Sequence, residues 1–436
     1  SRLLSKENEL TGTVMRYDYD RFDFLIRQET TQGSETDVIY RVPDFVGNLF
    51  GTPDRKDRKY GAGGKLLEDP DCFYHYDDEG NLIFREFKQL QETGVRYDRK
   101  RMEKERGIRC LATGTGWLYE WASNGMLKKV IRPDGRPVEF RYDALGRRTV
   151  KRYFGKTTRW VWNGNVPLHE WSYKAIGLQS DEEENIPPKE PVEDITTWVF
   201  EAGTFVPTAK IQDGKQYSIV SDYLGTPIQM YDEKGYKTWE CTLDIYGKVV
   251  NFEGFFLNDC PFRFQGQYED KETGLYYNRF RYYSPETGSY FSQDPIRLYS
   301  SNPTFYGYIY DTNIGVDIFG FTGTYMFTDG KKWYIGKGPK SRMYQSMDIR
   351  VGGYTNVTKG LHIDYGNNNT GLMVEAALMR RNQAVTSIDF LNQINSPGEK
   401  MLTDAYQKNR ALYDDIMKKA DDFEAEFKQL KGIKCH

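Results

Sequence analysis

The chain has 436 residues, of which 38% are hydrophobic and 15% aromatic, and its formal net charge is −3 at pH 7. That length exceeds one ordinary domain and predicts two or three. No apolar run approaches the roughly 18 residues that a membrane-spanning helix needs, so we expect no membrane segment, and no signal peptide in this sequence. With 33 Tyr, aromatic rather than aliphatic side chains are expected to supply much of the core.

The Cys and His positions disfavour two kinds of site, and the charge distribution distinguishes two parts of the chain. The five Cys and four His are scattered, without a C-x-x-C or H-E-x-x-H motif, which disfavours a disulfide framework and a Cys/His metal centre. Residues 322–436 carry 17 Lys and Arg against 13 Asp and Glu, whereas the whole chain is acidic. We therefore expect a mildly basic C-terminal part after an acidic body.

From about Met15 to Val250 a loose repeat predicts a ladder of β-hairpins. The pattern Tyr-Asp-x-x-Gly recurs, and Asp or Asn followed by Gly is typical of a tight turn with the Gly at positive φ. Alternating stretches with wide aromatic residues flank these turns, as at residues 159–162 and 237–243. One hairpin is unstable alone, so we expect the hairpins to stack. The turns are predicted at 76–80, 123–125, 132–135, 142–146, 231–235 and 244–247, with Tyr17-Asp18 as a relative.

Two segments beyond the simple repeat carry a family resemblance. They read SDYLGTP at residues 221–227 and GLYYNRFRYYSPETG at residues 274–288. Together with the Tyr-Asp turns, these two segments carry the resemblance. Residues from about 10 to 321 resemble Rhs/YD-repeat proteins and the related C component of Tc toxins. The resemblance implies a mainly β fold, in which YD-repeat hairpins form a spiral shell, or cocoon, around a C-terminal cargo. The alternative is a β-rich repeat protein of a cell surface without enzymatic activity.

The repeat region ends in two aspartates, each followed by a short apolar run. Asp294 opens the motif DPIRL and Asp317 opens DIFGF, with eighteen residues between the motifs. Two carboxylates brought together share one proton, because like charges a few ångströms apart do not both ionise cheaply. Such a pair activates water against a peptide bond. From residue chemistry alone, two turn aspartates are the simpler interpretation.

This pair of motifs resembles the junction of the same family, which carries two Asp-Pro-x-Gly-Leu motifs at about this spacing. In that family the two Asp form an aspartyl autoprotease, and the chain is cut just after the second motif. The resemblance implies that Asp294 and Asp317 form the dyad and that the cut follows Phe321. Arg297, Ile318 and Phe321 depart from the family pattern, whereas both Asp are kept.

After Phe321 the pattern becomes that of a small α/β domain. We therefore predict a shell over residues 1–321 and a C-terminal domain over residues 322–436. Apolar stretches on either side of Asp329-Gly330 predict a β-hairpin. Helical spacing of apolar residues predicts helices over residues 340–348, 372–382 and 399–430.

The hairpin resembles the GIY-YIG nuclease motif, with Gly-Thr-Tyr at 323–325 and Tyr-Ile-Gly at 334–336. Thr324 in place of Ile and a short turn depart from that family. His362 is interpreted as an assisting residue or a structural one. Taken singly, Tyr334 is more simply explained as a packed strand residue, and Arg342 and Glu375 are also explained as surface charge and a solvated helix face. The resemblance implies a catalytic set in the family's order: Tyr325, Tyr334, Arg342, Glu375 and Asn392, with Asn395 as the alternative to Asn392.

These residue types suit the cleavage of phosphodiesters. A Tyr helps to activate the attacking water, and Mg²⁺ or another divalent ion on Glu375 polarises the scissile phosphate. Arg342 stabilises the charge that develops on phosphorus, because its cation is planar and permanent. Lys337 and Lys340 are placed to hold backbone phosphates without reading bases.

Together these features predict a polymorphic toxin of the Rhs family, with an autoprotease and a metal-dependent endonuclease. The resemblance implies delivery into target cells in interbacterial competition, often through type VI secretion. It also implies a cognate immunity protein and N-terminal shell or secretion-system components as partners. The expected substrate is nucleic acid, DNA ahead of RNA. A second hypothesis keeps the shell but gives the C-terminal domain an activity on a base or nucleotide, and a third is the non-enzymatic surface protein.

Overall fold

The computed structural model describes most of residues 2–294 and shorter stretches of the remaining chain. The described residues are 2–9, 11–21, 24–174, 190–294, 304–309, 311–313, 315–317, 324–328, 333–337, 358–363, 368–381, 410–429 and 433–435. The chain divides into two compact units, Ser1–Gln293 with Tyr306–Gly320 and Asp294–Phe305 with Phe321–His436. The division at residue 321 that the sequence suggests stays a prediction.

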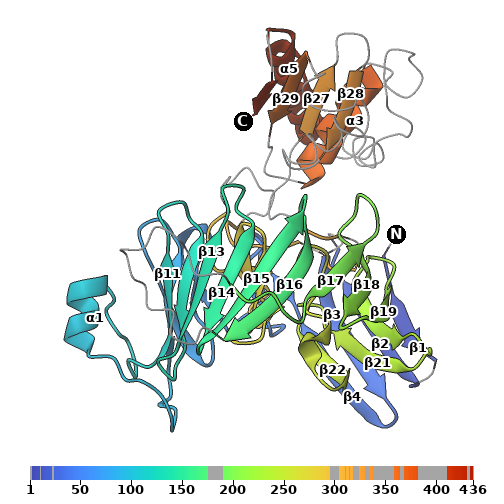
Figure 1. Ribbon diagram of the computed structural model, residues 1–436. Coiled ribbons are helices and arrows are strands. Elements are labelled where there is room, and N and C mark those ends of the chain that lie inside the picture. The colour runs from blue at the N-terminus through green and yellow to red at the C-terminus, as the bar shows by residue number, and fades with distance from the viewer. Residues whose placement is uncertain are drawn as a thin grey trace. The chain divides into compact units, whose positions relative to one another are not determined.

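The first unit is built on one antiparallel sheet of 16 strands, from β7 (Lys59–Tyr60) to β22 (Val249–Gly254), in which each strand pairs with the next along the chain (Figure 1). This meander confirms the predicted ladder of hairpins. A short helix, α1 (Arg99–Arg106), is inserted between β10 (Leu82–Phe87) and β11 (Gly116–Trp121). The other strands are β8 (Leu66–Glu68), β9 (Cys72–Tyr76), β12 (Leu127–Ile131), β13 (Pro137–Tyr142), β14 (Arg148–Tyr153), β15 (Lys156–Asn163), β16 (Val166–Lys174), β17 (Thr196–Phe200), β18 (Pro207–Gln212), β19 (Lys215–Ser221), β20 (Pro227–Asp232) and β21 (Lys237–Leu243).

The Tyr-Asp-x-x-Gly turns share one hydrogen-bonding pattern. At Asp143, Oδ1 accepts the backbone N–H groups of Leu145 and Arg147, both at 2.9 Å, while Gly146 takes a φ of 72°. The strand register shifts at Tyr142, as in a hairpin that closes with a bulge. The carboxylate thus satisfies the turn's free donors, and Gly supplies the left-handed backbone. The same carboxylate pattern recurs at Asp222, Asp232 and Asp244.

A smaller four-stranded sheet precedes the long one, with β1 (Ser5–Asn8), β2 (Thr13–Tyr19), β3 (Leu25–Gln32) and β4 (Glu35–Tyr40) in that order. The prediction of a turn at Tyr17-Asp18 is wrong, because both residues lie inside β2; the turn follows at Asp20, whose carboxylate accepts the backbone N–H of Phe24 at 2.9 Å. Met15 and Tyr17 are buried with Ile245 and Tyr246, which follow β21. β5 (Val42–Pro43) and β6 (Leu49–Phe50) pair beyond this sheet.

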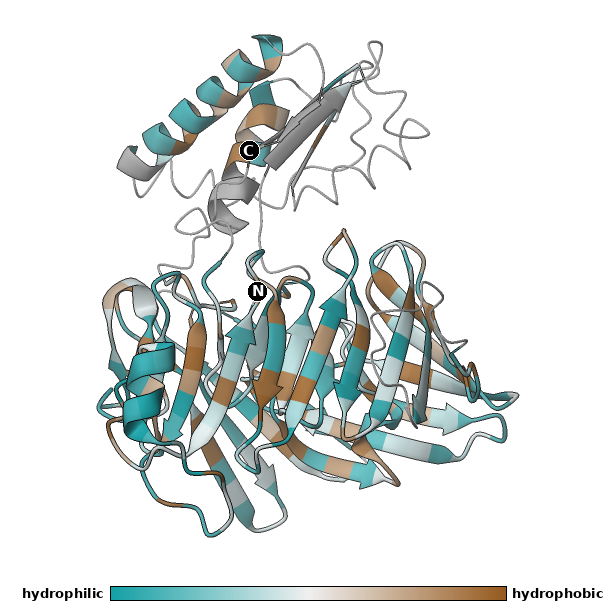
Figure 2. Cartoon of the chain, turned by 60° about the vertical axis from the view of Figure 1, so that its left-hand side comes forward, coloured by the Kyte–Doolittle hydropathy of each residue, from teal (hydrophilic) through white to brown (hydrophobic). Residues whose placement is uncertain are grey.

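A third sheet packs against the aromatic side chains of the long sheet. It consists of β23 (Tyr268–Asp270), β24 (Leu275–Asn278), β25 (Arg281–Ser284) and β26 (Ser289–Tyr290). Elsewhere in the unit, one 3-10 turn (Ala62–Gly64) lies between β7 and β8, and another (Leu257–Asp259) lies between β22 and β23. Hydrophobic and hydrophilic residues alternate along the strands of the long sheet, as one buried face requires (Figure 2). Ring pairs join the two sheets: Trp160–Tyr268 at 5.6 Å, Phe140–Tyr282 at 5.3 Å and, just outside the third sheet, Trp198–Phe262 at 4.8 Å.

A buried ion pair lies within this aromatic core. Arg148 is 1% exposed, and its guanidinium donates to the carboxylate of Asp270, which is fully buried. Its central carbon lies 4.5 Å from the ring centroids of both Trp160 and Tyr277, a distance at which cation–π attraction acts. Lys151 adds a second cation, 3.0 Å from the other oxygen of Asp270. One carboxylate of the third sheet is therefore held by two cations of the long sheet.

The second unit is a small α/β unit. Its sheet has the order β28 (Trp333–Lys337), β27 (Thr324–Thr328), β29 (Lys359–Ile363) and β30 (Ile433–Cys435), and its helices are α3 (Asn368–Arg381) and α5 (Arg410–Gln429). On α5, Ile416, Ala420 and Phe423 are buried at helical spacing. The predicted hairpin is present, as are helices over much of residues 372–382 and 399–430; the predicted helix at 340–348 lies outside the described residues. No helix in the described ranges is long and apolar enough to cross a membrane.

Replacing Arg148 by Met should strongly destabilise the first unit, because Asp270 would remain as a buried charge with Lys151 alone. Losing one partner of such a pair typically costs about 3–5 kcal/mol. Urea unfolding of the full chain measures this loss. Arg16→Met is the matched control, because Arg16 is 57% exposed beside Glu29 and should change stability by less than about 1 kcal/mol. Equal effects of the two substitutions would contradict the importance of the buried pair.

A second buried carboxylate holds the loop after α1. Glu86 is fully buried, and its oxygens accept the backbone N–H groups of Leu111, Ala112 and Gly114 at 2.7–2.9 Å. The His75 ring lies 3.0 Å away. Burial alone would raise the pKa of Glu86, but these partners outweigh it and lower the pKa to about 2.

Because the folded pKa of Glu86 lies below its ordinary value of 4.5, its ionised form stabilises the fold above that pH. The contribution should be lost as the pH falls from there toward about 2, and should amount to about 3 kcal/mol. Urea unfolding between these pH values measures the free energy of unfolding. As the pH falls, this free energy should decline less steeply for Glu86→Gln than for the native chain. Glu139→Gln, on a side chain that is 44% exposed, should leave the decline unchanged. A parallel decline in native chain and Glu86→Gln would contradict this role.

Candidate functional site

The strands of the second unit bring three predicted catalytic positions together. In the hairpin, Tyr325 of β27 pairs with Gly336 of β28, and Tyr334 pairs with Phe327. On the other edge of β27, Tyr325 pairs with His362 of β29. Tyr325 therefore lies on the central strand, between the Tyr-Ile-Gly strand and the His362 strand. The register places these positions on three adjacent strands although His362 is far away in the sequence.

Glu375 comes to this sheet on α3, which packs against β28 and β27. Its neighbours Val374 and Leu378 are fully buried in the core of the unit, and Glu375 itself is only 8% exposed. Glu375 therefore lies on the face of α3 that packs in the core of the unit. Carboxylate oxygens suit Mg²⁺, and the binding of a divalent ion by Glu375 stays a prediction.

The roles of the other predicted site residues of this domain also stay predictions. Tyr334 is half-buried, and the chain positions of Tyr325, His362 and Lys337 are described without their side chains. Within the described ranges no group of three His, Cys, Asp or Glu side chains is close enough to hold a metal ion. Arg342, Lys340, Asn392, its alternative Asn395 and the predicted cleavage point at Phe321 lie outside the described residues.

The second Asp of the junction lies in a buried polar cluster of the first unit. Asp317 is 9% exposed, and its Oδ2 accepts the Tyr290 hydroxyl at 2.9 Å and lies 3.2 Å from a guanidinium nitrogen of Arg281. Asn278 donates to the backbone carbonyl of Asp317 at 2.8 Å. The central carbon of Arg281 lies 3.6 Å from the ring centroid of Tyr290. The cation and the hydroxyl both favour an ionised Asp317.

Tyr290 keeps its proton in this cluster. Burial raises the pKa of Tyr290 well above its usual value, and the charge of Asp317 raises it further. Its hydroxyl is therefore a lasting donor to the carboxylate. Sequence reasoning missed both Arg281 and Tyr290, because only the third sheet brings them to Asp317. The available signal was Arg281 itself, a cation within the aromatic run YYNRFRYY at residues 276–283.

The first Asp of the junction belongs to the second unit. Asp294 is 2% exposed, and its backbone N–H donates to the carbonyl of Phe305 at 2.8 Å. Both predicted carboxylates are thus buried, which is unusual for aspartates of exposed turns. Their pairing as an acid dyad stays a prediction.

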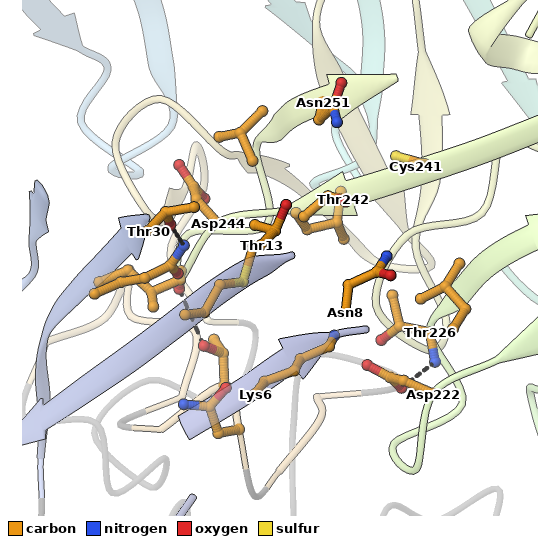
Figure 3. A pocket seen from close by; sticks show the side chains of 18 of the residues that line it. Lys6, Asn8, Thr13, Thr30, Asp222, Thr226, Cys241, Thr242, Asp244 and Asn251 are labelled. Carbon is orange, nitrogen blue, oxygen red and sulfur yellow. Dashed lines mark hydrogen bonds between the residues drawn. The ribbon is translucent and has the colours of Figure 1, made fainter. Parts of the chain in front are cut away.

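A cavity of about 780 Å³ lies elsewhere in the first unit, between β1–β4 and the last strands of the long sheet. Thr13 and Thr30 line it from the smaller sheet, and Thr242 and Asn251 line it from β21 and β22 (Figure 3). Asp244, at its margin, is buried, and burial raises the pKa of this carboxyl to about 6. The walls mix apolar and polar side chains, and their charged residues are mostly acidic: Glu35, Asp37, Asp222, Glu240 and Asp244 against Lys6. None of the predicted site residues is among the described residues that line this cavity.

Two family models match parts of the repeat region. Residues 193–314 match the Teneurin YD-shell family, and residues 123–158 match the RHS Repeat family. A relative from Dickeya dadantii (strain 3937), named Probable deoxyribonuclease RhsB, is 29% identical over 340 residues, which are 75% of this chain and 21% of the relative.

A second relative and a solved structure are also similar to this chain. Double-stranded DNA deaminase toxin A from Burkholderia cenocepacia (strain H111) is 28% identical over 374 residues, 82% of this chain and 24% of the relative. The solved structure of the Photorhabdus luminescens Tc holotoxin pore matches 73% of this chain and 18% of that chain, at 17% identity and a TM-score of 0.38. The chain therefore spans about a fifth to a quarter of the length of these curated relatives.

Proposed function

Because the chain is an RHS/YD-repeat protein related to Rhs toxins, we propose that it is the shell end and the toxic domain of such a toxin. In this proposal the YD-repeat shell holds the C-terminal domain, and aspartyl autoproteolysis after Phe321 frees it. The freed domain, residues 322–436, is a metal-dependent endonuclease of GIY-YIG type acting on DNA ahead of RNA. Delivery into target cells, a cognate immunity protein and further shell or secretion components belong to the same proposal.

The observation that carries the nuclease proposal is the strand register of the second unit. Tyr325 lies beside both the Tyr-Ile-Gly strand and His362, and α3 brings the buried Glu375 to the same sheet. A divalent ion on Glu375 would supply Lewis-acid help at the scissile phosphate. The tyrosines would help to take the proton from the attacking water, and Arg342 would stabilise the developing charge. The relative named a deoxyribonuclease supports the same reaction class.

The autoprotease proposal is supported by the unequal surroundings of its carboxylates. A dyad needs one ionised member to activate water and one protonated member to donate to the peptide. Arg281 and Tyr290 favour an ionised Asp317, so Asp317 takes the role of base and Asp294 that of acid. Arg281 then acts as a positioning residue that holds Asp317 in its charged form.

A second candidate is the same shell with a domain that modifies bases. It is favoured by the relative named a double-stranded DNA deaminase toxin, which matches 82% of this chain. The two candidates differ in the lesion: a nuclease breaks phosphodiesters, whereas a base-modifying enzyme leaves the strand intact.

The dyad predicts that Asp294→Asn and Asp317→Asn each leave full-length chain on a denaturing gel, whereas the native chain separates after Phe321. Arg281→Met should slow the cut, because Asp317 would lose the cation that keeps it charged. Asp259→Asn, an aspartate on a 3-10 turn of the first unit, is the control and should be cut normally. Cutting of the double Asn variant, or a native chain that never separates, would show that the autoprotease is absent.

The nuclease predicts that the full chain, or residues 322–436, nicks supercoiled plasmid with Mg²⁺ and not in excess chelator. Glu375→Gln and Arg342→Met should each lower the rate on the order of 10²–10³-fold, because each removes a group that stabilises transition-state charge. Glu424→Gln on α5 should retain activity, and circular dichroism should show all variants folded. A variant lacking both groups that still cleaves at the native rate would rule out this mechanism.

A further inference from the structure

The residue pair that closes the hairpin between β24 and β25 contacts Asp317. Asn278 pairs with Arg281 across this hairpin, and the turn between them consists of Arg279 and Phe280. Side chains directly opposite one another in an antiparallel pair lie on the same face of the sheet. Arg281 reaches the Asp317 carboxylate, and Asn278, which is fully buried, reaches the backbone of the same residue. The hairpin therefore brings an amide as well as a cation to this aspartate.

The amide nitrogen of Asn278 makes two hydrogen bonds in this cluster. It donates to the backbone carbonyl of Asp317 at 2.8 Å and to the hydroxyl oxygen of Tyr290 at 2.6 Å. A backbone carbonyl only accepts hydrogen bonds, so the nitrogen of the amide, and not its oxygen, must face it. Both N–H groups of Asn278 are used in this way, which fixes the orientation of its side chain.

This arrangement gives the Tyr290 hydroxyl a direction. Its oxygen accepts from Asn278, so its single proton is donated to Oδ2 of Asp317, at 2.9 Å. Hydrogen bonds in such a chain polarise one another, which strengthens the bond to the carboxylate. The backbone of Asp317 is held as well, because its N–H donates to the Tyr308 hydroxyl at 3.3 Å and its carbonyl accepts from Asn278. One amide thus acts on the carboxylate and on the backbone that carries it.

We propose that Asn278 is a positioning residue of the autoprotease, which aims the Tyr290 hydroxyl at Asp317 and holds the Asp317 backbone in place. The inference rests on the proposed function, in which Asp317 takes the proton of the attacking water. Asn278 itself touches none of the reacting atoms. Without the amide, Asp317 should be a poorer base at acidic pH, because its ionised form would lose hydrogen-bonding support.

The pH dependence of cutting tests this role. Full chain from cell-free synthesis is shifted to buffers between about pH 4 and pH 8, and a denaturing gel follows the fraction cut with time. The titratable side chains that face Asp317 in this cluster are Arg281, Tyr290 and Tyr308. Burial raises the pKa of both tyrosines well above this range, and Arg281 stays charged throughout it. The midpoint of the pH–rate curve therefore reports the carboxylates.

Two single substitutions should raise this midpoint. Tyr290→Phe should raise it by about one pH unit, because a hydrogen bond to a charged group is typically worth that much. Asn278→Ala should raise it by a smaller amount, because the hydroxyl remains but has lost the partner that orients it. Asn278→Asp keeps the shape of the side chain and should raise the midpoint further than Asn278→Ala, since neighbouring carboxylates oppose each other's ionisation. It is the second variant if Asn278→Ala does not fold.

Combining the substitutions separates positioning from a merely structural role. In the Tyr290→Phe chain, Asn278→Ala should add no further shift of the midpoint, because the hydroxyl through which it acts is gone. Asn48→Ala is the matched control and should leave the midpoint unchanged. Asn48 is also buried, and its amide also donates to an aspartate carboxylate, that of Asp44 at 2.8 Å, between β5 and β6.

The outcomes distinguish this inference from the autoprotease itself. If the native chain is cut but the Asn278 variants keep the native midpoint, or lose rate equally at every pH, the inference is overturned and the autoprotease stands. An unchanged midpoint in Tyr290→Phe would overturn it in the same way. A native chain that never separates would overturn both.

Discussion

The first unit depends on one buried charge pair, Arg148 with Asp270, inside an aromatic core. The long sheet presents Trp, Tyr and Phe side chains on one face, and these must be covered before the hairpins are stable as a sheet. The third sheet covers them. Aromatic contacts alone would allow the third sheet to slide along the long sheet. The carboxylate of Asp270, held between Arg148 and Lys151, fixes one position of the third sheet. We therefore infer that the pair sets the register between the two sheets, a specificity role that buried ion pairs are known to serve in some proteins.

The same third sheet also builds the surroundings of Asp317. Arg281 of β25 and Tyr290 of β26 reach Asp317, while Tyr277 and Tyr282 of the same sheet pack on the long sheet. The carboxylate proposed as base is thus assembled only when the third sheet is in place. In the proposed function, this arrangement would delay autoproteolysis until the shell has folded, so that the C-terminal domain is not released early.

Much of this architecture could be predicted from local sequence, and the failures have physical causes. The Asp and Gly of each repeat specify their turn through bonds to neighbouring residues, so turns such as Asp143–Gly146 were predictable. The turn expected at Tyr17-Asp18 forms two residues later, at Asp20, because Tyr17 and Asp18 pair with β3. Arg281 and Tyr290 were missed because their contact with Asp317 is set by strand pairing, which a linear pattern does not contain. In the second unit, the hairpin and α3 followed from turn and helix signals, whereas the roles of Tyr325, His362 and Glu375 rest on resemblance.

We propose that residues 322–436 break the phosphodiester backbone rather than modify bases. Sequencing DNA from cells that express this domain, in a strain unable to repair deaminated bases, tests it most directly. The account predicts fragmented DNA whose break ends are enriched over control cells, with base substitutions at background frequency. Intact DNA that carries an excess of one class of base substitution would contradict the account and favour the base-modifying alternative.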